Sequence, residues 1–148
     1  MACGSSTKTL DPTPIERAIA QSILKQRAIT TVVRCPTNAP VKTGYRFTCS
    51  AALDVGSYTL HVVELNAKGG VSYSNSTPLQ TLNYRTVEFA IQEAVRRKKH
   101  LRATVSCPKS ILQAKGLTFR CTATTKLGTG PFVVTETNSV GHVSFKGL

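Results

Sequence analysis

The sequence predicts an α+β protein made of two tandem copies of one small domain, each a helix packed on a four-stranded antiparallel sheet. One observation is an internal repeat, and a second is the change within each copy from a helical to an alternating hydrophobic period. A third is a pair of cysteines at the same spacing in each copy. Each copy would hold about 70 residues, a size at which a hydrophobic core alone is marginal and disulfides are common.

The repeat has an offset of 72 residues and needs no gap. In the cysteine region of the first copy, the repeated positions are Val33, Cys35, Pro36, Gly44, Phe47, Cys49 and Ala51. Their counterparts are Val105, Cys107, Pro108, Gly116, Phe119, Cys121 and Ala123. Chance does not place so many matches on one diagonal, so the chain contains a duplication. We expect a tether over residues 1–10, repeats over 11–76 and 83–148, and a linker over 77–82.

Each copy opens with a predicted helix. In the first copy, Thr13, Pro14 and Glu16 form a capping-box pattern. In the second copy Arg85 replaces Thr13, so we expect a poorer cap there. The spacing of one helical face is shown by Ile15, Ala18, Ile19, Ser22 and Ile23, and by Val87, Ala90, Ile91, Ala94 and Val95.

After the helix, the hydrophobic period becomes two. In the first copy, strands are expected over residues 31–35, 45–53, 57–65 and 71–74, with turns over 54–56 and 66–70. The helix must cover one face of this sheet, because a lone small sheet cannot bury itself.

Four of the five cysteines follow the repeat, and we expect disulfides Cys35–Cys49 and Cys107–Cys121. Four cysteines allow three connectivities, but only this one survives duplication of a single bridged unit. A zinc site is disfavoured because no close Cys-x-x-Cys pair is present. Disulfides imply an oxidising compartment.

The fifth cysteine, Cys3, lies in Met1-Ala2-Cys3-Gly4-Ser5-Ser6, followed by polar residues. This segment resembles the end of a bacterial lipoprotein signal, where small residues precede an acylated cysteine. The upstream apolar region of such a signal is absent from the sequence. We expect lipidation at Cys3; the alternative is a free thiol without a role.

The motifs Val33-Arg34-Cys35-Pro36 and Gly44-Tyr45-Arg46-Phe47-Thr48-Cys49, with their copies in the second half, resemble the actinobacterial domain of unknown function numbered 4333. The resemblance covers nearly everything after residue 11. It implies a secreted protein or lipoprotein of the cell envelope and carries no known activity. The second copy departs from the first at the last turn, where Val140 and His142 replace Lys68 and Gly70.

No enzymatic constellation can be assembled from the sequence. His61, His100 and His142 are not repeated and show no metal-ligand spacing, so we expect surface positions and no metal or cofactor. Glu64 and Glu136 recur, and we expect them to face solvent, paired with Arg or Lys; the alternative is a pair of carboxylates across a dimer-like axis. We therefore expect a protein without catalytic residues.

The net charge of +12 is shared unequally. Residues 11–82 carry 7 basic and 4 acidic side chains, whereas residues 83–148 carry 11 and 3. The excess centres on Arg96, Arg97, Lys98, Lys99 and Arg102, near the end of the second helix. Cations there complement the helix dipole by about 0.3–1 kcal/mol each, but one or two would suffice. Helix-end complementation and a polyanion contact both remain open.

The leading hypothesis is an extracytoplasmic envelope lipoprotein of binding or structural type that contacts anionic lipid or wall polymer through this cluster. The alternative is a secreted protein-binding or inhibitor module. Nucleic acid is disfavoured by the oxidising compartment, the absence of Trp and the few aromatic residues.

Overall fold

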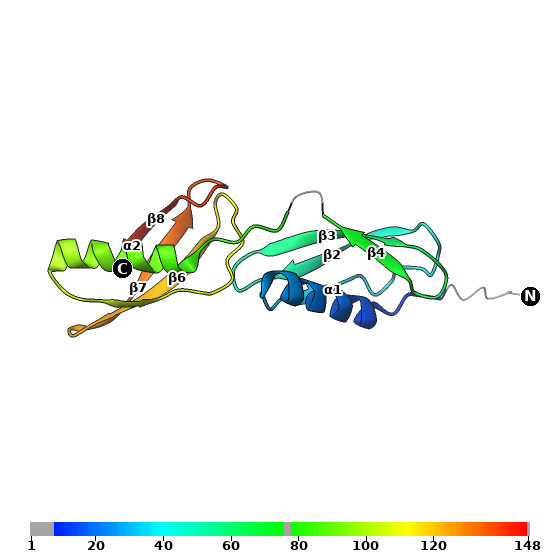
Figure 1. The fold of residues 1–148 in the computed structure, drawn as a ribbon, viewed down its shortest axis with the longest axis horizontal. Coiled ribbons are helices and arrows are strands. Elements are labelled where there is room, and N and C mark those ends of the chain that lie inside the picture. Colours follow the sequence, from blue (N-terminus) through cyan, green and yellow to red (C-terminus); the bar gives the residue numbers. More distant parts are fainter. Residues whose placement is uncertain (1–7, 76–77, 148) are drawn as a thin grey trace, which may run out of the picture. The chain divides into compact units, whose positions relative to one another are not determined.

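The computed structural model describes residues 8–75 and 78–147 and divides the chain into two compact units. Unit 1 consists of Met1–Ala52 and Ser57–Leu79, and unit 2 of Leu53–Gly56 and Gln80–Leu148. Each unit contains one helix and one four-stranded antiparallel sheet (Figure 1). The predicted α+β fold with two tandem copies is confirmed.

The elements of unit 1 follow the predicted order. They are α1 (Pro12–Arg27), β1 (Val32–Arg34), β2 (Arg46–Ala52), β3 (Ser57–Glu64) and β4 (Val71–Ser74). The sheet is a meander with the strand order β1-β2-β3-β4. The predicted strands agree with the observed ones to within one residue at each end.

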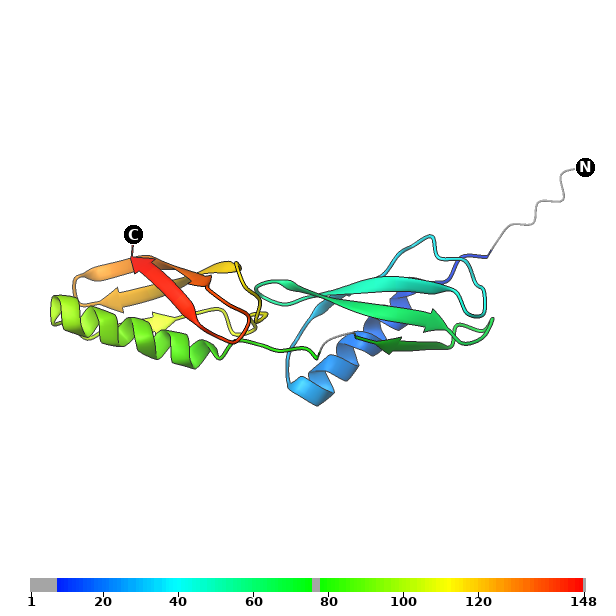
Figure 2. The same cartoon turned by 90° about the horizontal axis from the view of Figure 1, so that it is seen from above.

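Unit 2 repeats this arrangement. Its elements are α2 (Tyr84–Lys99), β5 (Thr104–Ser106), β6 (Thr118–Thr125), β7 (Gly128–Glu136) and β8 (Val143–Gly147). The strand order is β5-β6-β7-β8, and α2 runs along one face of this sheet (Figure 2). The two units therefore share the same order of elements and the same strand order, although most of their side chains differ.

Each helix buries one narrow apolar face against its sheet. The buried positions are Ile15, Ile19 and Ile23 in α1 and Val87, Ile91 and Val95 in α2. Residues four apart lie one above another on a helix, so this spacing gives a single stripe. The predicted core faces are confirmed at these six positions.

The helix caps differ from the prediction. Asp11, one residue before α1, accepts a hydrogen bond from the Thr13 N–H at 3.0 Å, and Asn83 does the same for Arg85 at 3.1 Å. The predicted capping box at Thr13 is therefore wrong. The prediction of a poorer cap for α2 is also wrong, because Asn83 caps α2 as Asp11 caps α1. Asp11 and Asn83 lie 72 residues apart and are both favourable N-cap residues, so the repeat itself contained the signal.

A short backbone pairing precedes each helix. In unit 1 it joins Thr9 to Pro40, and in unit 2 it joins Thr81 to Leu112, again at the repeat offset. Leu10 and Leu82, the next residues, are buried. Residues 8–10 and 80–82, expected as tether and linker, thus pair with the loop that follows the first strand of their own unit.

Both predicted disulfides are present. Arg34 pairs with Ser50 and Ser106 pairs with Thr122 in the antiparallel register. The residue after each first strand therefore lies opposite the residue before Ser50 or Thr122. Cys35 thereby faces Cys49 with 4.4 Å between Cα atoms, and Cys107 faces Cys121 with 4.3 Å. The two bridges indicate an oxidising, extracytoplasmic environment. Neither described helix has the length and apolar character needed to cross a bilayer.

Candidate anion-binding site

The end of α2 presents a continuous group of cations. Arg96, Arg97, Lys98 and Lys99 form the last helical turn, and all four side chains are exposed. His100 then ends the helix in the left-handed conformation, with φ of 54°, and its N–H donates to the Arg96 carbonyl. Arg102, two residues beyond, is also exposed. We call these five basic residues the basic cluster.

One member of the basic cluster is paired. The Arg96 guanidinium contacts the Glu93 carboxylate at 2.7 Å, an i,i+3 ion pair on the helix surface. The hydrogen bond from Arg96 lowers the pKa of Glu93, and the same bond raises the pKa of Arg96. Within residues 8–75 and 78–147, no ion pair involves Arg97, Lys98, Lys99 or Arg102. The cluster therefore keeps most of its positive charge.

The corresponding end of α1 is less basic. It carries Lys25 and Arg27 in its last turn and ends at Ala28, which is also left-handed, with φ of 56°. The Arg27 guanidinium donates to the Leu79 carbonyl, so this cation serves a contact inside unit 1. The two helix ends share their backbone geometry and differ in charge.

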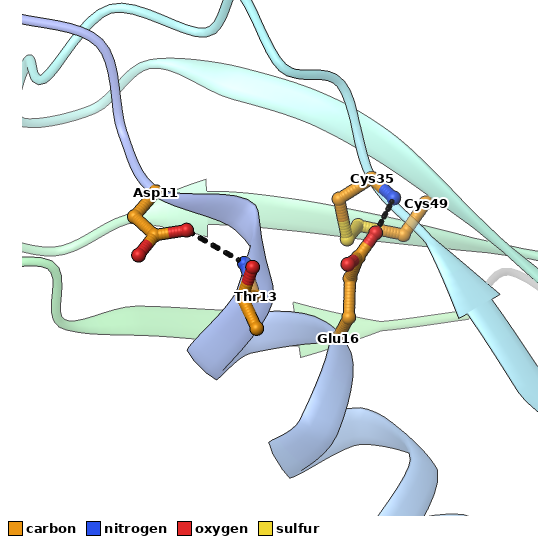
Figure 3. Close-up of a disulfide and its surroundings, with 5 residues drawn as sticks. All are labelled: Asp11, Thr13, Glu16, Cys35 and Cys49. Atoms are coloured by element: carbon orange, nitrogen blue, oxygen red, sulfur yellow. Dashed lines mark hydrogen bonds between the residues drawn. A yellow bond between two sulfur atoms is a disulfide. The ribbon is translucent and has the colours of Figure 1, made fainter.

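A glutamate on each helix contacts the disulfide of its own unit, a repeated feature that was not predicted from the sequence. Glu16 lies on α1 and its Oε2 accepts a hydrogen bond from the Cys35 N–H at 2.8 Å (Figure 3). In unit 2, Glu88 accepts the same bond from Cys107 at 2.9 Å. A carboxylate that accepts a backbone N–H makes a charge-assisted bond. These residues join the helix to the cysteine strand, and Glu16 is not the capping residue predicted.

The expectation that Glu64 and Glu136 face solvent is wrong. Both are only 1% exposed, and neither is paired with Arg or Lys in the described residues. Their Oε1 atoms accept from the Lys42 N–H at 3.0 Å and the Ala114 N–H at 3.1 Å. Burial raises the pKa of Glu136, and the bond from Ala114 opposes that shift. These carboxyl groups hold the loop after the first strand of each unit.

The histidines are scattered. His61 lies exposed on β3, His100 ends α2, and His142 lies exposed in the turn before β8. Within the described part of the chain, no group of three or more His, Cys, Asp or Glu side chains has metal-binding geometry. Cys3, the predicted lipidation site, lies outside the described residues.

Comparison of the chain with family models, with curated proteins and with solved structures found no match. The resemblance to the actinobacterial domain of unknown function stays a prediction carried by the cysteine motifs.

Proposed function

We propose that the protein is an extracytoplasmic envelope protein of binding type, whose basic cluster contacts an anionic lipid surface or wall polymer. The observation that supports this is the exposed run of cations at the end of α2, where Arg96 alone has an acidic partner among the described residues. The disulfides support an oxidising compartment outside the cytoplasm.

The basic cluster carries more positive charge than the dipole of α2 requires. The dipole of α2 is complemented by one or two cations near its C-terminus. The cluster supplies four in the last turn and one more beyond the cap. Like charges gathered on one surface repel each other, so the surplus has a cost that contact with an anionic surface would offset.

Removing the surplus charge should abolish binding to anionic vesicles. Each Lys or Arg near an anionic surface contributes about 1 kcal/mol, so four contribute about 4 kcal/mol, roughly a thousandfold in affinity. The test is co-sedimentation with phosphatidylglycerol vesicles in a Cys3→Ser background, which excludes any acyl anchor. The test variant carries Arg97→Gln, Lys98→Gln, Lys99→Gln and Arg102→Gln.

A matched control removes the same charge from unit 1. It carries Arg17→Gln, Lys25→Gln, Arg34→Gln and Arg46→Gln, all at exposed positions. We expect it to lose much less binding than the test variant. Binding of the parent should also weaken as salt rises from about 0.1 M to about 1 M, which shortens the Debye length from about 10 Å to about 3 Å. Equal loss in both variants would show a diffuse charge effect, and no binding by the parent would favour a protein partner.

The second part of the proposal is that Cys3 is acylated and anchors the chain. Expressed behind a bacterial lipoprotein leader, the protein should partition into detergent and carry acyl mass on Cys3, and Cys3→Ser should release it. A bacterial lipoprotein cysteine carries a diacylglycerol, and two acyl chains are enough for stable anchoring. Neutralising the basic cluster should therefore leave the acylated protein in the membrane fraction, whereas Cys3→Ser should not remain there. A Cys3→Ser form that stays in the membrane fraction would place the anchor elsewhere.

A further inference from the structure

Unit 2 contains a groove of about 640 Å³ between the second half of α2 and strands β6, β7 and β8. Its volume lies in the range of about 300–1,000 Å³ that is typical of small-molecule sites. The apolar lining includes Val95, Leu101, Ala123, Phe132 and Phe145. The two phenylalanine rings pack edge to face, with centroids 6.1 Å apart. The groove is thus an apolar site walled by one helix and one sheet.

The repeat explains why this space is open. Gly130 lines the groove and pairs with Ala123 across β6 and β7. In unit 1 the matching residue is Tyr58, which pairs with Ala51 at the same register. A Cβ built on Gly130 would meet no heavy atom within 4 Å beyond its chain neighbours. Replacement of a large side chain by glycine therefore leaves room beside β7.

The contacts of Tyr58 in unit 1 indicate where the corresponding open space lies in unit 2. Its side chain is 8% exposed, and its hydroxyl accepts a hydrogen bond from the Asn75 side-chain amide. Burial raises the pKa of this hydroxyl, and the positive charge of Arg27, the last residue of α1, opposes that shift. The counterpart of Arg27 in unit 2 is Lys99, which lines the groove together with Gly130. The counterpart of Asn75 is Gly147, which also lines the groove, so in unit 1 a tyrosine reaches from β3 to the residue after β4 across the region that unit 2 leaves open.

The charge of the groove indicates that its ligand carries an anionic group. Lys98, Lys99 and Lys146 line it, and none of the described lining residues is Asp or Glu. An apolar wall with cationic side chains complements an anion attached to a hydrocarbon group. A peptide would need partners for its backbone N–H and C=O groups, whereas an acyl chain needs none. Among the lining residues, the polar side chains are those of the three lysines and of Thr125 and Thr129, which favours the acyl chain.

We propose that unit 2 binds a single-chain anionic amphiphile, a long-chain carboxylate, with its acyl chain against Phe132 and Phe145 and its carboxylate at Lys98 and Lys99. This site goes beyond contact with an anionic surface, because it accepts one monomeric ligand. Lys98 and Lys99 belong to both sites, whereas Arg97 and Arg102 do not line the groove. That difference separates the two functions experimentally.

The test uses the whole chain and laurate below its micelle concentration, titrated against bound dansyl-undecanoate. The parent should bind the probe saturably, one per chain, with a blue-shifted emission, and laurate should displace it. Gly130→Tyr places the side chain of unit 1 into the groove and should lower the affinity by at least about tenfold. Gly130 is not in the left-handed region, so tyrosine is compatible with its backbone. Vesicle binding by this variant should stay unchanged.

A second pair of variants keeps the core intact. Lys98→Gln with Lys99→Gln should weaken probe and laurate binding by at least about tenfold. Arg97→Gln with Arg102→Gln removes the same charge outside the groove, so it should weaken vesicle binding while laurate affinity stays within about twofold. The proposal is overturned if the parent shows no saturable binding, or if Gly130→Tyr, folded by circular dichroism, binds as the parent does. Equal loss in both charge variants would also overturn it.

Discussion

Replacing both cysteines of one bridge by alanine should lower the free energy of unfolding of that unit by about 3 kcal/mol. The expectation rests on the loop that each bridge closes: its cysteines are 14 residues apart, and the chain-entropy estimate for such a loop is about 3 kcal/mol. A unit of about 70 residues has a total stability of only about 4–10 kcal/mol. Loss of one bridge thus removes a large share of the stability of its unit.

Hydrogen exchange read by mass spectrometry can measure this effect for each unit separately. The variant with Cys35→Ala and Cys49→Ala should open the β1–β4 peptides, and the one with Cys107→Ala and Cys121→Ala should open the β5–β8 peptides. Each variant provides the control for the other. If neither variant accelerates exchange, the helix and sheet of each unit are stable without their bridge and the loop-entropy argument fails.

The sequence predicted the topology because period and repeat are local, countable signals. The bridges followed from the same logic, since a duplicated pair of cysteines has one consistent connectivity. The caps differ from the prediction because Thr13, Pro14 and Glu16 match a capping box, whereas Asp11 and Asn83, which recur at the offset of 72, match only in chemical type. Asp and Asn are both favourable N-cap residues, so the signal lies in the chemical type of the two positions and not in their identity.

The buried glutamates were missed for a different reason. Glu64 follows Tyr58, Leu60 and Val62 at alternate positions, and all four are buried on one face of β3. Strict alternation therefore places Glu64 on the core face. Carboxylates are rarely buried without a partner, so the residue type favoured solvent while the alternation favoured the core. The hydrogen bond from the Lys42 N–H explains how the buried carboxyl group is accommodated.

The groove in unit 2 was beyond sequence reasoning. The difference between Tyr58 and Gly130 is visible in the sequence, but its consequence depends on which side chains surround the vacated space. Phe132, Phe145 and Lys99 come from two strands and a helix that only the fold brings together. A cavity results when neighbours fail to fill a site, and that outcome is a matter of packing in three dimensions.

Glu136 should make unit 2 less stable as the pH rises above about 4.3, the pKa of a glutamate in the unfolded chain. Its side chain is 1% exposed, and within the described residues its Oε2 has no hydrogen-bond partner. Burial raises the pKa of Glu136 because the charged form loses its hydration. The folded chain therefore holds this proton more tightly than the unfolded chain does.

The sign of the effect follows from proton linkage. Between the unfolded and the folded pKa, the folded state binds more protons, so the free energy of unfolding decreases as pH increases. The contribution is fully present below about 4.3 and is lost as the pH rises through the folded pKa. The contribution of Glu93, on α2 of the same unit, changes with pH in the opposite direction, because its hydrogen bond from Arg96 lowers its pKa.

The measurement compares hydrogen exchange of unit 2 peptides between pH 4 and pH 7 in the parent, Glu136→Gln and Glu93→Gln. Glutamine at 136 keeps an oxygen for the Ala114 N–H and cannot titrate. The parent should therefore lose stability relative to Glu136→Gln as the pH rises. Relative to Glu93→Gln, the parent should gain stability as the pH rises through the lower part of this range. The reason is that the stabilising contribution of ionised Glu93 is lost at low pH. Parallel profiles for the parent and Glu136→Gln would show that the carboxyl at 136 is hydrated or paired in solution, contrary to its burial on the core face of β7.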